Sequence, residues 1–527
     1  MPAFFHHERI GGLKSSAISA ILIERPFKID EESRAFLECG LALCLLNCGI
    51  QCEATMAAVR DVTSTEMAGA GAQDAVELAK RHLVQPWPFA GSVGAEARAL
   101  IGAGEGIYIT DATGKRLIDG PAGMWCINVG HRREELAKVM YDQAMALSYN
   151  TPWYTMNAPS AELAMRIAGH APGDLSHVFF TTGGSSAVET ALRFMQFYNN
   201  VRGRPEKKLI LSRGGAYHGS TYLSASLNGR PRDRDWMDGA DELVVKLSSP
   251  DPFRRPKGMS VAAFTDALVA EFRDMVARVG ADRIGAFVGE PVQASGGVIV
   301  PPEGYLQRIR TICRDNDILY ISDEVVTAFG RLGHVFASGE VFGIEPDMIT
   351  FAKGVTSGYF PLGGVILSER LLEELRRSNH PDAMFGHGLT YTSHPVGCAV
   401  ALKNLDILDE SVLAHTREVA PYFQAQLKTL EELPLVGEVR GMGLMGCVEC
   451  VADRDSKDPL QLDKDVGKRI DAHCHELGLL VRPLINMCVM SPPLIITREQ
   501  IDDMVSILRE GISRTMDDLR REGVWRG

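Results

Sequence analysis

The sequence predicts an α/β fold, with a large domain built on a mostly parallel sheet flanked by helices and a smaller α+β domain. The first observation is that strand-like and helix-like segments alternate between residues 160 and 370. The second is that two of the apolar runs end in charged residues, Asp323 and Lys353. The third is the change beyond residue 396 to long amphipathic helices and a glycine-rich hairpin.

The composition is that of a globular protein. The 527 residues are 45% hydrophobic and 23% charged, which argues against disorder, collagen or a coiled coil. The net charge of −12 comes without a basic stripe, so we expect no nucleic-acid partner. The 11 cysteines follow no disulfide or metal-site spacing, which predicts reduced thiols, a cytoplasmic location and no bound metal. No stretch is apolar and long enough to predict a membrane span.

The chain divides by rhythm into four parts. Residues 1–66 do not share the pattern of the rest and are predicted to be an N-terminal extension. We expect residues 67–145 to form the N-terminal part of the small domain and residues 146–395 to form the large domain. Residues 396–527 then complete the small domain.

The N-terminal part of the small domain shows a helix and a hairpin. Residues 74–84 have helical spacing, and two apolar runs surround a polar, glycine-closed turn within residues 106–120. Gly102, Gly104 and Gly106 form a G-x-G-x-G motif, which lacks the spacing of the dinucleotide-binding fingerprint and precedes a hairpin rather than a helix. This excludes a Rossmann dehydrogenase.

The large domain contains five runs that predict strands. Their residues are 178–182, 209–212, 285–290, 319–323 and 348–352. Helical segments between the runs place helices on both faces of the sheet. Ligands of such sheets bind at the carboxyl ends of the strands, so the residues that follow each run are candidate site residues.

A glycine-rich turn follows the first of these strands. Gly183, Gly184, Ser185 and Ser186 lead into a helix, whose free N–H groups and positive dipole end favour an anion such as phosphate. Glycine lets the anion approach closely because it has no β-carbon. The residues from Ser186 to Glu189 also match a capping box, which would explain the serine and the glutamate without any ligand. Both interpretations stay open.

Lys353 and Asp323 are the candidate reactive residues. A lysine in a partly desolvated pocket has a lowered pKa and can attack an aldehyde; the alternative is a surface lysine at a strand end. Asp323 is the inward-facing carboxylate, since side chains alternate along a strand and Glu324 must point the other way. Asp323 could pair with a protonated ring nitrogen of a ligand or form a structural ion pair.

The loop from Gly214 to Gly219 presents an aromatic ring and an imidazole. A planar cofactor could stack on Tyr217, and the alternative is a turn anchored by that tyrosine. His218 is assigned no chemical step.

Together these motifs resemble the class III, pyridoxal-phosphate-dependent aminotransferases over residues 74–520. The matching stretches are Thr182-Gly183-Gly184-Ser185, Tyr217-His218-Gly219, Gly289-Glu290-Pro291-Val292-Gln293, Asp323-Glu324-Val325, Ala352-Lys353-Gly354 and Gly388-Leu389-Thr390-Tyr391. The resemblance implies fold type I of the pyridoxal phosphate enzymes and a homodimer with active sites at its interface, or a tetramer.

The resemblance also implies a role for each matching residue. Lys353 would form a Schiff base with the cofactor and then shuttle the proton, while Asp323 would pair with the pyridinium nitrogen. Tyr217 would stack on the ring, and Thr390 would reach the phosphate from the neighbouring subunit. The other residues expected to bind the cofactor are Gly184, Ser185, His218, Glu290 and Val325.

Within the family, the chain is most similar to the ω-amino acid or amine:pyruvate aminotransferases, through residues 119–126 and 491–494. This similarity places Trp125 in the substrate pocket and makes Arg482 the candidate clamp for the carboxylate of a keto acid. Trp87 and Trp153 would add aromatic walls. Plain core or interface packing is the alternative for all three tryptophans.

The expected reaction moves an amino group from an amine or ω-amino acid to a keto acid such as pyruvate. Ornithine-type relatives carry a glutamate where this chain has Ser295 and a glutamine where it has Val326, which argues against a donor with an α-amino acid head. The alternatives are a mutase or decarboxylase that uses the same cofactor, and a non-catalytic protein of the same fold.

Overall fold

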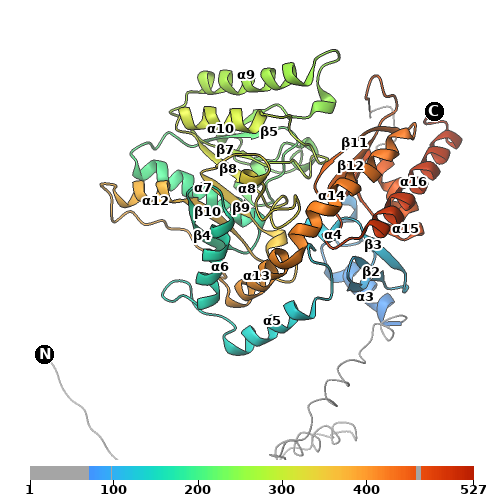
Figure 1. Ribbon diagram of the computed structural model, residues 1–527, viewed down its shortest axis with the longest axis horizontal. Coiled ribbons are helices and arrows are strands. Elements are labelled where there is room, and N and C mark those ends of the chain that lie inside the picture. The colour runs from blue at the N-terminus through green and yellow to red at the C-terminus, as the bar shows by residue number, and fades with distance from the viewer. Residues whose placement is uncertain (1–69, 97, 459–464) are drawn as a thin grey trace, which may run out of the picture. The chain divides into compact units, whose positions relative to one another are not determined.

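A seven-stranded mixed sheet forms the centre of the molecule (Figure 1). The computed structural model describes residues 70–96, 98–458 and 465–527. From one edge of the sheet to the other, the strands are β4 (Leu175–Thr181), β10 (Gly363–Ser368), β9 (Met348–Phe351), β8 (Leu319–Asp323), β7 (Ile284–Gly289), β5 (Leu209–Arg213) and β6 (Val244–Leu247). Neighbours from β9 to β6 pair in parallel, and β10 is antiparallel to both β9 and β4. The predicted mostly parallel sheet is therefore confirmed.

The five predicted strands correspond to β4, β5, β7, β8 and β9. Strand β10 was not predicted, because Gly363 and Gly364 are weak strand formers. Their role is tertiary: a β-carbon on Gly363 would lie 2.8 Å from Phe351 O, and one on Gly364 would lie 2.9 Å from Phe179 O. The two glycines thus allow β10 to fit between its neighbours.

Helices cover both faces of this sheet. Helix α7 (Gly184–Val201) packs on one face, against Ile210, Val288 and Ile321. Helices α9 (Val261–Val279) and α10 (Tyr305–Asp315) pack on the other face, where the adjacent residues Leu211, Phe287 and Tyr320 point (Figure 1). The change of face between neighbouring residues follows from the period of two in a strand.

There are two smaller four-stranded sheets, of which the first joins strands from the beginning and the end of the described chain and the second uses C-terminal strands alone. Their strands are β1 (Ile101–Glu105), β2 (Tyr108–Asp111), β3 (Arg116–Asp119) and β13 (Leu479–Leu480) in one, and β11 (Val436–Met442), β12 (Met445–Cys450), β15 (Met487–Met490) and β14 (Arg482–Leu484) in the other. Both predicted hairpins are confirmed, as β2–β3 and β11–β12. Because β13 pairs in parallel with β3, C-terminal residues complete the N-terminal sheet.

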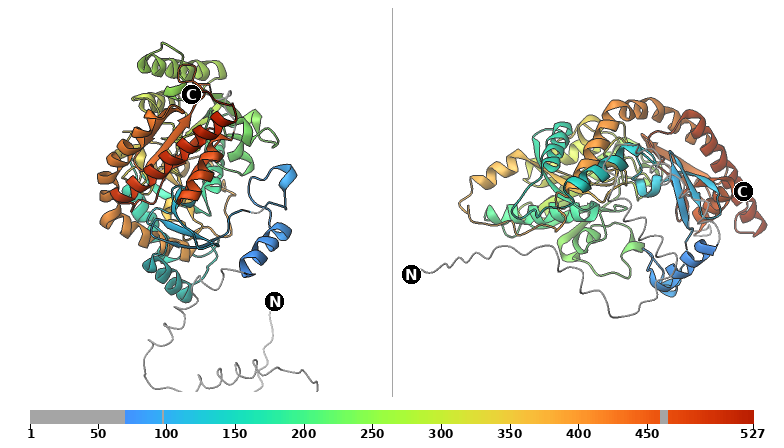
Figure 2. Two further views of the ribbon diagram at one scale, coloured as in Figure 1. Left: turned by 90° about the vertical axis from the view of Figure 1, so that its right-hand side faces the viewer. Right: turned by 90° about the horizontal axis from the view of Figure 1, so that it is seen from below.

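The remaining longer helices lie around these sheets. They are α3 (Ala70–His82), α5 (Glu134–Ala146), α6 (Ala158–His170), α12 (Glu369–Arg376), α13 (Pro395–Ile407), α14 (Leu413–Lys428), α15 (Val466–Leu477) and α16 (Arg498–Arg521). Helix α16 begins at Arg498, behind a capping box formed by Thr497 and Gln500. Helices α15 and α16 pack side by side at the C-terminal end (Figure 2).

The domain boundaries stay a prediction, and the expected extension, residues 1–66, lies outside the described residues. None of the described helices is long and apolar enough to cross a membrane. Within the same residues, no group of histidine, cysteine and acidic side chains is arranged to hold a metal ion.

Candidate active site

A cavity lies where the carboxyl ends of β4, β5, β7, β8 and β9 meet. Each strand, or the loop after it, contributes residues to the lining, as expected for a ligand site in an open α/β sheet. The lining residues are Gly184, Ser185, Tyr217, His218, Gly219, Glu290, Val292, Ser295, Asp323, Val325, Val326 and Lys353. The structure thus brings together all the residues expected to bind the cofactor except Thr390.

Lys353 enters this cavity from the turn that follows the buried strand β9. Its amine makes no hydrogen bond or ion pair with any residue that the structure describes. Burial lowers the pKa of Lys353; the negative charge of Asp323 opposes this shift and the positive charge of Arg482 adds to it. Lys353 therefore loses its proton more readily than a lysine in water and more readily becomes the neutral, nucleophilic amine.

The turn that carries Lys353 is held rigidly. Lys353 has a positive φ of 46°, and a β-carbon on Gly354 would collide with the side-chain amide of Asn128. Asn404 Nδ2 donates to the carbonyls of Gly354 and Val355, at 2.9 and 3.0 Å. The glycine after the lysine is thus required by close packing.

Asp323 ends β8 and is buried beside the cavity. Its Oδ1 accepts hydrogen bonds from Thr350 Oγ1 at 3.1 Å and from the Val325 amide at 3.2 Å. Its Oδ2 accepts one from His218 Nδ1 at 2.6 Å. Glu324 is buried elsewhere, where it accepts hydrogen bonds from the backbone amides of residues 337 and 338. The two carboxylates therefore point in opposite directions, as the strand period predicts.

His218 is fully buried and only partly satisfied. Its backbone amide donates to Asn228 Oδ1 at 2.7 Å, which fixes the loop, and its Nδ1 is committed to Asp323. Its Nε2 is buried and has no hydrogen-bond partner among the residues that the structure describes. Buried polar atoms normally have a hydrogen-bond partner, so a polar group of a ligand is a suitable partner for this atom.

Glu290 connects the loop that carries Tyr217 to the end of β7. Its carboxylate accepts hydrogen bonds from the amides of Tyr217 and Ala294, each at 3.1 Å. Burial raises the pKa of Glu290, and nearby His218 opposes that rise. The glutamate therefore holds the tyrosine loop at the wall of the cavity.

Helix α7 presents an uncapped N-terminus to the cavity. The helix begins at Gly184 behind Gly183, and no side chain caps it. Ser186 Oγ donates to the Gly183 carbonyl at 2.9 Å, and Glu189 accepts from Thr221 Oγ1 at 2.8 Å. The capping-box interpretation is therefore wrong, because Glu189 is engaged by the loop after β5. The first N–H groups of α7 remain available to an anion.

Two glycines keep this end of the cavity open. A β-carbon on Gly184 would lie 2.9 Å from Val325 Cγ1, and one on Gly219 would lie 2.8 Å from Ser185 Oγ. Ser185 Oγ also accepts a hydrogen bond from the Ser220 amide at 3.0 Å. Side chains at either glycine would thus fill the space that an anion needs.

Arg482 and Trp125 lie together near Lys353. The guanidinium carbon of Arg482 is 5.5 Å from the centroid of a Trp125 ring, and α4 (Ala122–Trp125) packs against the Lys353 turn. In the described part of the chain, Arg482 has no ion pair; burial, followed by the charge of Arg230, lowers its pKa to about 10. Trp125 Nε1 is buried without a partner. Both side chains can therefore still donate hydrogen bonds.

Three predicted site residues lie away from the cavity of their own chain. Trp87 is 56% exposed and Trp153 is 73% exposed. Thr390 is exposed as well, and its carbonyl accepts a hydrogen bond from the Tyr149 hydroxyl at 2.9 Å. Residues not predicted to belong to the site are Gly219, Val292 and Arg230, of which Gly219 and Val292 lie in stretches that match the family.

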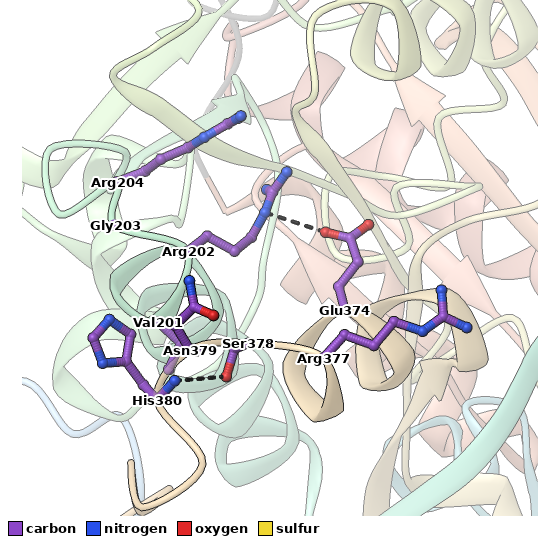
Figure 3. Close-up of a pocket in the computed structure, with 9 residues that line it drawn as sticks. All are labelled: Val201, Arg202, Gly203, Arg204, Glu374, Arg377, Ser378, Asn379 and His380. Atoms are coloured by element: carbon purple, nitrogen blue, oxygen red, sulfur yellow. Dashed lines mark hydrogen bonds and ion pairs between the residues drawn. The ribbon is translucent and has the colours of Figure 1, made fainter.

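A second hollow lies on the surface, between the end of α7 and the end of α12 (Figure 3). Its arginines are compensated by acidic neighbours: Arg202 contacts Glu374 and Asp317, each at 3.2 Å, and Arg377 contacts Glu373 at 2.8 Å. Figure 3 shows Arg202 turned toward Glu374. With its charges satisfied in this way, the hollow is a poor candidate for a reactive site.

The cavity fits pyridoxal phosphate. The uncapped helix suits the phosphate, Asp323 suits the ring nitrogen, and Lys353 supplies an amine without a partner. The buried, unpaired His218 Nε2 and the glycine-lined entrance are both consistent with a polar ligand in this space.

Comparisons with known proteins agree with this site. The family model "Aminotransferase class-III" matches residues 92–512. The putrescine–pyruvate aminotransferase of Pseudomonas aeruginosa is 37% identical over 83% of this chain and 95% of its own.

Solved structures agree as well. An (S)-enantioselective ω-transaminase from Thermomicrobium roseum superposes with a TM-score of 0.80 at 39% identity, over 85% of this chain and 98% of its own. The ω-transaminase of Pseudomonas jessenii, solved in complex with PMP, gives a TM-score of 0.80 at 34% identity, over the same shares of 85% and 98%. The chain therefore belongs to the class III aminotransferases, enzymes of fold type I that depend on pyridoxal phosphate.

Proposed function

We propose that this aminotransferase moves an amino group from an amine or ω-amino acid to a keto acid, with pyruvate as the acceptor. The observation that carries the proposal is the guanidinium of Arg482, which is partly buried, without an ion pair in the described chain, and close enough to influence the charge of Lys353. A carboxylate is the partner that a guanidinium holds best. Pyruvate is also the acceptor in the name of the Pseudomonas aeruginosa relative.

Lys353 would hold the cofactor through a Schiff base and would move the proton between the donor carbon and the cofactor. Its lowered pKa suits both tasks, because the amine must be free of its proton to attack and to accept. When bound, pyridoxal phosphate supplies the electron sink for this proton transfer. Asp323, oriented by His218 and Thr350, would hold the positive charge of the ring nitrogen.

The remaining cofactor contacts follow from the lining. Gly184 and Ser185 would bind the phosphate at the start of α7, and Tyr217 and Val325 would contact the ring. Glu290 would position Tyr217 through its backbone amide. These contacts orient the ring, which is the protein's part in a cofactor reaction.

The donor side of the cavity favours an amine without an α-carboxylate. Ser295 and Val326 line the cavity, so neither position supplies a charged group for the head of an α-amino acid. Trp125, next to Arg482, would provide an apolar wall. We therefore propose terminal amines and ω-amino acids as donors.

We also propose a homodimer with shared active sites, or a tetramer made of two such dimers. The support is a group of exposed apolar side chains that includes Trp153, Tyr154 at 91% and Met156 at 87% exposure. Thr390 and Trp87, which lie away from the cavity of their own chain, would then serve the cavity of the partner. A cytoplasmic location is proposed because all seven cysteines in the described residues are free thiols.

The test is an amine panel assayed with the purified full chain loaded with pyridoxal phosphate. Putrescine, β-alanine and 1-phenylethylamine are each supplied with pyruvate, and alanine is measured. Alanine formation that depends on the donor supports the proposal. If glutamate forms from 2-oxoglutarate with these donors while no alanine forms from pyruvate, the proposed acceptor is wrong.

A further inference from the structure

A second arginine, Arg230, stands at the edge of the same cavity. Its guanidinium carbon lies 5.4 Å from the centroid of the Tyr217 ring, and its Nη1 donates to the Ser295 carbonyl at 2.9 Å. Tyr217 and Ser295 both line the cavity, so Arg230 is fixed against two walls of the site. Arg230 lies outside the stretches that match the family, and its position depends on the loop after α8 (Tyr222–Ser226).

Arg230 is held in place by one acidic partner. Its Nε donates to Asp233 Oδ2 at 2.7 Å, and its Nη2 contacts the same oxygen. Together with the Ser295 contact these hydrogen bonds use three of the five N–H groups of the guanidinium, so within the described structure one N–H of Nη1 and one of Nη2 remain. The loop therefore presents a preorganised donor pair, which costs little side-chain entropy when a ligand binds.

Arg230 and Arg482 also act on each other. Among nearby charges, Arg230 is the largest cause that lowers the pKa of Arg482, ahead of the opposing effects of Tyr217 and Asp233. Two guanidinium groups with a single carboxylate between them leave a net positive charge at this end of the cavity. An anion that binds there would relieve this repulsion.

We propose that Arg230 is a second carboxylate-binding residue, which shares with Arg482 the carboxylate of the keto acid. This inference rests on the proposed function, since it assigns a further specificity residue to the same acceptor site. Asp233 then sets the strength of the clamp, because its carboxylate competes with the ligand for the charge of Arg230.

The test measures binding of propionate to the pyridoxal phosphate holoenzyme by calorimetry. Propionate carries the carboxylate of pyruvate but has no keto group, so it binds without accepting an amino group. We expect Arg230→Met to raise the Kd of propionate about tenfold, the size of one charge-assisted hydrogen bond. In turnover, the same variant should raise the KM of pyruvate, with a change below about twofold in the KM of a carboxyl-free amine.

Asp233→Asn supplies a test of opposite sign. Asparagine keeps an oxygen for Arg230 but removes the competing charge, so the Kd of propionate should fall about threefold. If Arg230 only supports the Ser295 loop, both variants would weaken binding, and that result would overturn the proposal. It is equally overturned if Arg230→Met leaves the Kd within twofold of the wild-type value.

Arg232→Met is the matched control. Arg232 lies two residues away on the same loop, is exposed, and makes no hydrogen bond or ion pair in the described structure. It carries the same charge, so a general effect of net charge would appear in both methionine variants. Alanine formation by the wild type distinguishes the proposed function from the proposed role of Arg230. If the wild type forms alanine and Arg230→Met does not change the Kd of propionate, only the role of Arg230 is refuted. If no donor yields alanine from pyruvate, the proposed function fails whatever propionate does.

Discussion

The cavity at Lys353 and the surface hollow at Arg202 are both lined by charged side chains, but their charges are balanced differently. In the hollow, Arg202 and Arg377 each have an acidic partner, and water reaches the site. In the described chain, Lys353 in the cavity and Arg482 near it have no ion pair, and His218 Nε2 is buried without a hydrogen bond.

The charges in the hollow are paired with each other, whereas the positive charges of Lys353 and Arg482 at the cavity are unpaired in the described chain and can bind a ligand. Exposed ion pairs contribute little to stability and little to chemistry. Uncompensated buried groups cost folding free energy, so a protein that keeps several of them in one cavity uses them for binding or catalysis.

The largest expected effect is that of removing the amine. Lys353→Ala should lower the rate of alanine formation by at least about 10³-fold, because in the proposed role this one side chain would both hold the cofactor and move the proton. Intact mass after borohydride reduction should show the cofactor attached to the wild type and absent from the variant. Arg377→Ala, in the surface hollow, should stay within twofold; a similar loss in both variants would break the comparison.

Asp323→Asn comes next. Loss of its negative charge should reduce turnover about 10²- to 10³-fold, the range seen when a preorganised electrostatic contact is removed. The rate of the half-reaction with the amine is measured in a single turnover, which is monitored by the absorbance of the cofactor. The matched variant is Asp317→Asn, which removes the acidic partner of Arg202 in the hollow. A loss below threefold for Asp323→Asn would contradict its assigned role.

Gly184→Ala tests shape instead of charge. The added β-carbon would lie 2.9 Å from Val325 Cγ1, so Val325 must shift and the phosphate end narrows. We expect the Kd of pyridoxal phosphate to rise about tenfold, or about 1.4 kcal/mol. Gly169→Ala in α6 is the control, since a β-carbon there meets no atom within 4 Å. Equal affinities of the two variants would show that the glycine is dispensable.

The smallest effect is on stability. Without cofactor, Lys353→Met should raise the unfolding free energy by about 0.5–2 kcal/mol at pH 7, because it removes a buried cation without a partner. Arg377→Met should change it very little. Urea unfolding of the cofactor-free proteins provides the measurement. If Lys353→Met is less stable than the wild type, the buried amine is stabilised by its surroundings and the explanation is wrong.

The same lysine predicts a pH dependence. Its folded-state pKa is lowered from the ordinary value of 10.5, so the unfolded chain binds the proton more strongly between the two values. The contribution of Lys353 to the unfolding free energy therefore rises with pH through that window and is constant above it. In Lys353→Met this share of the slope should disappear.

Much of the fold could be predicted because the apolar runs that form the strands are visible in short stretches of the sequence. The bounds of β8 match the prediction, since four apolar or small residues are followed by a charged one, and β9 differs only at its last residue. Strand β10 could not be predicted, because its two glycines are weak strand formers and are favoured only by their close contacts with β4 and β9 in the folded sheet.

The site divides in the same way. Lys353, Asp323 and Tyr217 lie at or shortly after the carboxyl ends of strands, where local sequence and the family motifs coincide. Arg230 was missed, because only the folded loop places it against Tyr217 and Ser295. Glu290 was placed by its motif, but its two backbone contacts could not be foreseen. The assignments of Trp87, Trp153 and Thr390 concern a second subunit and stay predictions.

The position of β10 also sets the order in which the enzyme can be assembled during its synthesis. Strand β4, which leads into the phosphate turn, lies at the edge of the large sheet and pairs only with β10. At ribosomal rates of about 5–20 residues per second, β4 must wait on the order of ten to forty seconds for that partner to emerge. Until then the edge of β4 that pairs with β10 is open. Because Asp323 and Lys353 also emerge long after β4, we expect cofactor capture to come late in synthesis, and this interval is when a chaperone could protect the exposed strand.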